Sequence, residues 1–201
     1  GVFLDDVSVV CNGSTPPPPP PPNQCVMDIV SDATNQVVGA GFATSTYSQN
    51  PRWTASIPGA TWIWKTFFVA DPLVDDTTSF TKTFTIISTS TVDSASLVVA
   101  PENSYTVFIN DQKIGADNTE INYFDENKDS YNVLPHLQNG SNKISFTVKN
   151  WALATSTPEF NPAGLLYKLS ISTHDSICNP VATNTPPTIT LIGADPFNLI
   201  V

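Results

Sequence analysis

Apolar and polar residues alternate along much of the chain. Residues 143–149 place Ile144, Phe146 and Val148 on one face and hydroxyl or lysine side chains on the other. A period of two over short segments bounded by turn residues predicts half-buried antiparallel strands. No segment shows helical periodicity beyond a single turn at 134–138. We therefore expect an all-β antiparallel sandwich, and further inward-facing positions of this kind fall within residues 80–86, 97–99, 105–109 and 165–171.

The composition supports strands and excludes some functions. Thr (24 residues) and Ser (19 residues) supply most polar positions, which favours strands and turns over helix. With 8 Lys and Arg against 18 Asp and Glu the net charge is −10, so the basic surface of a nucleic-acid binder is missing. No apolar run approaches the roughly 18 residues of a membrane span. We therefore expect no nucleic-acid partner and no membrane span.

Proline and turn residues divide the chain into a central module with extended ends. Residues 16–22 are seven consecutive prolines, which form a polyproline II rod about 22 Å long. The first residue is Gly rather than Met, so we expect a mature or excised piece. The predicted units are a strand of a neighbouring β domain at 1–11, a polyproline linker at 12–24, the central sandwich at 25–178, a second linker at 179–187, and the first strands of another domain at 188–201.

Three cysteines suggest an oxidising compartment. Cys11 and Cys25 flank the stiff rod, and a disulfide needs Cα atoms ~5.5 Å apart, so we disfavour that pair. Cys25 opens the central module and Cys178 closes it, and the ends of a domain often lie near each other. We predict a Cys25–Cys178 disulfide that stabilises the fold by ~4–5 kcal/mol, with Cys11 paired outside this segment. The setting is then extracellular.

Short motifs of the central module follow one another in an order found in other proteins. They resemble the galactose-binding-like jelly-roll domains of bacterial glycoside hydrolases and surface proteins, such as the N-terminal modules of α-L-rhamnosidases. The resemblance covers about residues 53–171 and implies a jelly-roll sandwich, but no single ligand, because this fold serves sugar binding, adhesion and packing alike. Its motifs are Thr61-Trp62-Ile63-Trp64, Phe80-x-Lys82-x-Phe84, Ser104-Tyr105-x-Val107-x-Ile109-Asn110, Tyr131-x-Val133, Leu137-x-x-Gly140-x-Asn142, Asn150 and Pro162-Ala163-Gly164-Leu165-Leu166.

The two ends resemble parts of other β domains. Residues 1–10 are similar to the closing strand of bacterial carbohydrate-binding jelly rolls, which implies a calcium ligand at Asp5 or Asp6, or else an ordinary edge strand. Residues 185–201 resemble the opening of bacterial immunoglobulin-like surface repeats. Such strands have unpaired backbone groups that favour pairing with another chain. The residues expected to exchange between subunits are Val2, Phe3, Val7, Val9, Ile189 and Leu191.

Aromatic residues are the candidates for sugar binding. A pyranose packs its C–H face on a ring, and Trp53, Trp151 and Tyr123 lie in predicted loops or at a strand end. Core packing is the alternative for each of them. Trp62 and Trp64 share one side of a strand and are expected in the core.

A short acidic segment is the candidate calcium site. Asp125, Asn127 and Asp129 place oxygen ligands at i, i+2 and i+4, as a calcium loop begins, although Ser130 and His136 stand where an EF-hand needs Gly and Glu. The alternative is an acidic surface turn. Calcium is the one cofactor that the sequence suggests, and none is required.

The remaining chemistry argues against an enzyme. His136 and His174 lie near no nucleophile motif, and nothing selects a catalytic pair of carboxylates. The first interpretation is a non-catalytic extracellular module of a bacterial surface or filament protein that self-associates by strand pairing. The alternative is a carbohydrate-binding module, with glycans as partners. The sequons at Asn12 and Asn139 are compatible with secretion.

Overall fold

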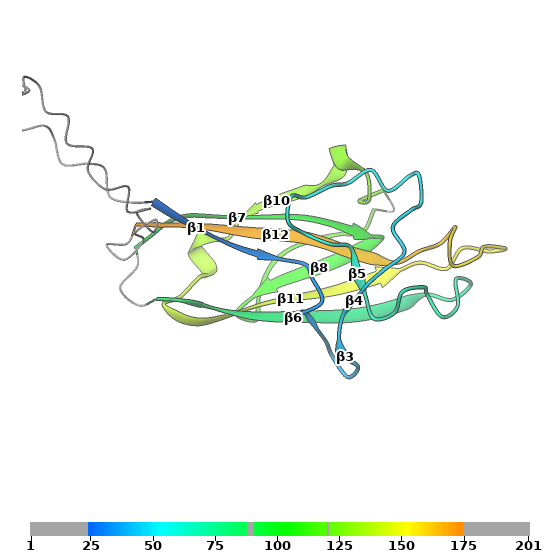
Figure 1. Ribbon diagram of the computed structural model, residues 1–201, viewed down its shortest axis with the longest axis horizontal. Coiled ribbons are helices and arrows are strands. Elements are labelled where there is room, and N and C mark those ends of the chain that lie inside the picture. Colours follow the sequence, from blue (N-terminus) through cyan, green and yellow to red (C-terminus); the bar gives the residue numbers. More distant parts are fainter. Residues whose placement is uncertain (1–23, 88–90, 120, 175–201) are drawn as a thin grey trace, which may run out of the picture.

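The computed structural model describes residues 24–87, 91–119 and 121–174, which form two antiparallel sheets packed face to face (Figure 1). The first, sheet A, has the order β10-β7-β12-β5-β4, and β1 pairs with β12 beside β5. The all-β sandwich predicted from the sequence is confirmed. The strands of sheet A are β1 (Gln24–Val30), β4 (Thr44–Ser45), β5 (Ile63–Trp64), β7 (Thr91–Glu102), β10 (Asp129–Asn132) and β12 (Gly164–His174).

Sheet B lies beneath it with the order β3-β2-β6-β11-β8-β9. The long pair β6 and β11 forms its centre, with Phe146 opposite Phe80 in the register. Short 3-10 turns, rather than longer helices, complete the described residues at Asp125–Asn127 and Leu134–His136. The strands of sheet B are β2 (Gln36–Val37), β3 (Gly41–Phe42), β6 (Asp76–Ile86), β8 (Ser104–Ile109), β9 (Gln112–Asp117) and β11 (Gly140–Asn150).

Alternate residues of the long strands fill the space between the sheets. Phe146 of β11 and Tyr167 of β12 stack with ring centroids 4.6 Å apart, and Trp64 contacts Phe80 at 5.6 Å. The expected inward positions are buried, except that Phe84 is half-buried at the margin of the core. The period-two pattern therefore predicted the core, whose fully buried side chains include Leu97, Val99, Val107, Ile109, Ile144, Val148, Leu165, Leu169 and Ile171.

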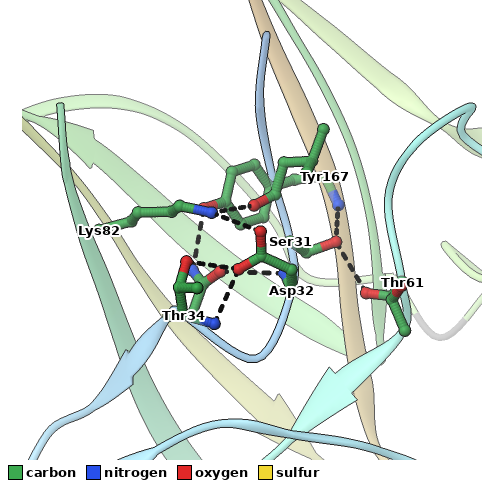
Figure 2. A network of polar contacts seen from close by, with 8 residues as sticks. Ser31, Asp32, Thr34, Thr61, Lys82 and Tyr167 are labelled. Atoms are coloured by element: carbon green, nitrogen blue, oxygen red, sulfur yellow. Dashed lines mark hydrogen bonds and ion pairs between the residues drawn. The ribbon is translucent and has the colours of Figure 1, made fainter.

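The turn that follows β1 ties the two sheets together (Figure 2). The Ser31 hydroxyl donates to the Thr61 carbonyl at 2.8 Å and accepts from the backbone N–H of Tyr167, on sheet A, at 3.1 Å. The carboxylate of the next residue, Asp32, forms an ion pair at 2.9 Å with Lys82 of β6, on sheet B. These contacts fix the start of the β2–β3 hairpin.

Several predictions concern residues outside the described ranges. They include the terminal strands and linkers, the exchange residues, Asp5, Asp6, Asn12, Cys11 and Cys178. Cys25 lies opposite Thr173 in the β1–β12 register. Thr173 precedes Cys178 by five positions in the sequence. The Cys25–Cys178 disulfide stays a prediction. Asn139 is exposed before β11.

Candidate functional site

A long loop covers one end of the outer face of sheet A. We call residues 50–62 the arm. Its side chains alternate, with Trp53, Ala55 and Ile57 buried and their neighbours exposed. Trp53 stacks on Trp62 with ring centroids 4.3 Å apart. The arm is therefore docked by a second hydrophobic cluster, separate from the core, that comprises Trp53, Ala55, Ile57, Trp62, Ala100, Tyr123 and Leu166.

A glycine on β12 makes room for this cluster. A Cβ added at Gly164 would lie 2.8 Å from both Trp53 Cη2 and Trp62 Cε3. Such an approach is shorter than any ordinary carbon contact, so the tryptophan pair requires glycine here. The motif at residues 162–166, which contains this glycine, thus has a local packing role.

Burial favours core packing, the stated alternative, for two of the three sugar-stacking candidates. Trp53 is 9% and Tyr123 is 7% exposed, and both rings pack inside the second cluster. Neither offers an open face to a ligand. Trp62 and Trp64 are both buried, as expected, but Trp62 belongs to this cluster and Trp64 to the main core. Trp151 is partly exposed after β11, and its role in binding stays a prediction.

In the predicted calcium segment, Asp125 and Lys128 form a clamp that holds the arm. Asp125 accepts from Lys128 Nζ at 2.5 Å and from the backbone N–H of Ser56 at 3.1 Å. Lys128 Nζ also donates to the Ser56 carbonyl at 3.2 Å, and the backbone N–H of Asp125 donates to Thr54 Oγ1 at 3.0 Å. The Lys128 hydrogen bond, helped by the Ser56 amide, lowers the pKa of Asp125. A lysine ammonium supplies the positive charge at this carboxylate.

The other two predicted calcium ligands turn elsewhere. Asn127 Nδ2 donates to the Ile121 carbonyl at 2.9 Å, and Asp129 Oδ2 accepts from the Tyr105 hydroxyl at 2.7 Å. Within residues 24–87, 91–119 and 121–174, no group of three His, Cys, Asp or Glu side chains could hold a metal ion. The segment forms a 3-10 turn followed by a strand, which spreads these three side chains, and their calcium role stays a prediction.

A groove lies between the arm and the exposed strands of sheet A. On its far side Lys168 pairs with Asp28 of β1 at 2.6 Å, and the Ser170 hydroxyl donates to the same carboxylate at 2.6 Å. These hydrogen bonds, from Lys168 first, lower the pKa of Asp28. The hollow has a volume of about 350 Å³ and is lined by Ser56, Ile57, Pro58, Ser96, Val98, Lys128, Lys168 and Ser170.

The chemistry of this groove suits a neutral polyhydroxylated ligand. Ile57, Pro58 and Val98 form an apolar strip, while serines and lysines supply hydrogen bonds around it. An apolar surface with a few placed polar groups is the usual form of a small-molecule site. Its lysines are ion-paired with Asp28 and Asp125, so the groove presents balanced rather than free charge. Both carboxylates have lowered pKa values and stay ionised at neutral pH, so neither can serve as a general acid.

A second surface of exposed rings lies between the end of β4 and the start of β6. Tyr47 contacts Phe68 with centroids 5.3 Å apart, and Phe67 contacts Phe68 at 4.7 Å. Phe67 is 51% and Phe68 is 39% exposed. The nearby Thr46 and Thr66 hydroxyls donate to the carbonyls of Phe67 and Phe68, at 3.0 Å and 2.6 Å, so these two hydroxyls are already engaged by the backbone. This surface is a weaker candidate than the groove.

The predictions from the sequence do not include the groove residues. Lys168 and Ser170 are the outward positions of β12, between the buried residues Tyr167, Leu169 and Ile171. The sequence carries no prediction for these outward positions. These positions line a groove only because the distant arm folds beside them. Sequence periodicity does not show where the arm lies.

No known protein family and no curated protein matches the chain. Solved structures that resemble it include an α-L-rhamnosidase from Streptomyces avermitilis complexed with L-rhamnose (17% identity, 78% of this chain, 15% of that chain, TM-score 0.41). They also include a Pleurotus ostreatus lectin in complex with GalNAc (20% identity, 72% of this chain, 36% of that chain, TM-score 0.43). A third is an FMN-binding β-glucuronidase from Facaelibacterium prausnitzii L2-6 (14% identity, 74% of this chain, 23% of that chain, TM-score 0.45). The chain spans about a third or less of these proteins. A likeness at this level assigns neither family nor ligand. Among the described residues no helix is long and apolar enough to cross a membrane.

Proposed function

We propose that this chain is a non-catalytic carbohydrate-binding module and that its glycan lies in the groove between the arm and sheet A. The observation that carries the proposal is the lining itself, in which an apolar strip stands between two ion pairs and three serine hydroxyls. The C–H face of a sugar ring packs on the strip while its hydroxyls exchange hydrogen bonds with the serines and lysines. The binding module, the alternative in the sequence interpretation, is thus preferred.

The arm makes this surface specific for a ligand of defined shape. Ile57 and Pro58 come from the arm, whereas Val98 and Lys168 come from sheet A. The second hydrophobic cluster and the Asp125–Lys128 clamp hold the two walls in place before any ligand arrives. A preformed site lowers the entropic cost of binding.

The filament interpretation receives no comparable support. Its exchange residues, such as Val2 and Ile189, lie outside the described ranges. An extracellular location remains part of the proposal, in keeping with the two sequons and the predicted disulfide. Catalysis is not proposed, because the carboxylates that border the groove are held ionised in ion pairs.

A glycan array probed with the labelled full chain tests this function. We expect binding to neutral glycans, and Lys168→Met should weaken it about tenfold or more, because a hydrogen bond from a charged group is lost. Lys143→Met is the matched control, since Lys143 pairs with Asp111 on sheet B at 2.7 Å, away from the groove. Trp151→Ala probes the remaining aromatic candidate. Binding that survives Lys168→Met but disappears with Trp151→Ala would contradict the groove.

A further inference from the structure

A second hollow adjoins the groove on the outer face of sheet A. It also has a volume of about 350 Å³, and its lining includes Ser94, Ser96, Ser130 and Asn132. Ser96 lines both hollows, so they are contiguous. The combined surface runs from β12 over β7 to β10, which is more than a single sugar ring can cover.

Cross-strand register aligns four polar residues along this surface. Asp28 of β1 lies opposite Ser170 of β12, Ser170 opposite Ser96 of β7, and Ser96 opposite Asn132 of β10. We call this line the polar row. Neighbouring strands are ~4.8 Å apart, so the row spans roughly 14 Å and offers one polar group per strand. It crosses the strands, and three of its residues, Ser170, Ser96 and Asn132, line the two hollows.

The row presents different hydrogen-bonding roles in order. Asp28 accepts from Ser170 Oγ, which leaves the Ser170 oxygen to accept from a ligand. Ser96 is exposed and can donate or accept. Asn132 uses Oδ1 to accept from the backbone N–H of Leu134 at 3.1 Å, so its amide nitrogen remains to donate. Alternating donors and acceptors match the hydroxyls of successive sugars.

The two ends of the row lie at edges of the described sheet. β10 is the last strand on one side, and β1 pairs only with β12 on the other. Within the part of the chain that the structure describes, no further strand blocks the path of a long ligand. The arrangement favours the interior of a polymer over its end.

We propose that the ligand is an extended, neutral, linear oligosaccharide of three or more sugars that lies along the polar row, across the strands of sheet A. This inference rests on the proposed function of the groove. Such a ligand corresponds to several consecutive internal sugars of a linear polysaccharide. A monosaccharide would fill only one hollow and would bind weakly.

Isothermal titration of the full chain with β-1,4-linked glucose, mannose and xylose oligosaccharides, each of one to six sugars, tests this inference. In the series that binds, affinity should rise at least about tenfold from the monosaccharide to the trisaccharide, the gain expected of one or two net hydrogen bonds. It should level off beyond four sugars, because the row then ends.

Asn132→Asp tests the distal end of the row. It keeps the oxygen that accepts from Leu134 and removes the donor, so the tetrasaccharide should bind several-fold more weakly while the disaccharide is unaffected. Asn118→Asp makes the same change in an exposed loop beyond sheet B and should alter neither. Equal affinity for one and six sugars, with Asn132→Asp silent, overturns the extended ligand and leaves the groove standing. Binding to none of the three series overturns both.

Discussion

The outer faces of the two sheets carry similar residues and yet differ as surfaces. Sheet B displays Ser79, Thr81, Thr83 and Thr147 along β6 and β11, and the hydroxyls of Ser79 and Thr147 lie 3.2 Å apart, within reach of each other. Sheet A displays Ser96, Ser170 and Lys168 beside a wall supplied by the arm. The hollows near sheet B flank the β2–β3 hairpin instead of such a wall.

The comparison shows that a hydroxyl-rich strand face does not make a site by itself. What distinguishes sheet A is a segment from elsewhere in the chain, fixed by the buried Trp53–Trp62 pair and by the clamp at Ser56. Substitutions that displace the arm should therefore remove the wall of the groove and leave sheet A with an open hydroxyl-rich face like that of sheet B.

The largest effect is expected when the tryptophan pair is removed. Trp62→Ala should lower the free energy of unfolding by about 3–5 kcal/mol, because a large buried ring is lost and a cavity remains. Urea unfolding followed by tryptophan fluorescence measures this. Trp151→Ala, which removes a partly exposed ring, should cost less. The reverse order would show that the arm contributes little.

A methyl group at Gly164 should have the next largest effect. Gly164→Ala places a Cβ 2.8 Å from both tryptophan rings and should destabilise the fold by about 1–3 kcal/mol through overpacking. In a Trp53→Ala background the same change should cost less, because one of the clashing rings is gone. Additive costs in the double-mutant cycle would argue against direct contact.

Removing the lysine of the clamp should lower glycan affinity much more than it lowers stability. Lys128→Met breaks an ion pair whose carboxylate is half-exposed, so the free energy of unfolding should change only slightly. Glycan affinity should nevertheless fall several-fold, since Lys128 both lines the groove and holds Ser56. Thermal unfolding and titration calorimetry on one sample compare the two. A loss confined to stability would refute the role in binding.

The smallest effect concerns pH. The pKa of Asp28 is lower in the folded chain than the ordinary value near 3.9, so its contribution to stability is complete above that value and disappears as the pH falls through the folded pKa. Unfolding free energies should not change through this group between pH 7 and 5, and should fall below about pH 4. The difference between wild type and Asp28→Asn should shrink over the same window. A difference that is constant down to pH 3 contradicts this ion pair.

Strand periodicity predicted the core because burial on one side of a sheet imposes a period of two on the sequence. Ile144, Phe146, Val148 and Leu169 are buried as expected. The groove was not predicted, since Ser96 and Ser170 are 74 positions apart and meet only through strand pairing. Trp53 and Tyr123 are binding candidates by their places in predicted loops, with core packing as the alternative. These loops fold back on the sheet and bury both rings.

The central claim is that the outer face of sheet A, bordered by the arm, is the glycan site. An NMR titration of the isotope-labelled chain with the best-binding oligosaccharide tests it most directly. We predict that backbone amide shifts change around Ile57, Ser96, Asn132 and Ser170, while those of Ser79 and Thr147 on sheet B stay constant. Changes confined to sheet B, or to Tyr47, Phe67 and Phe68, would contradict the account.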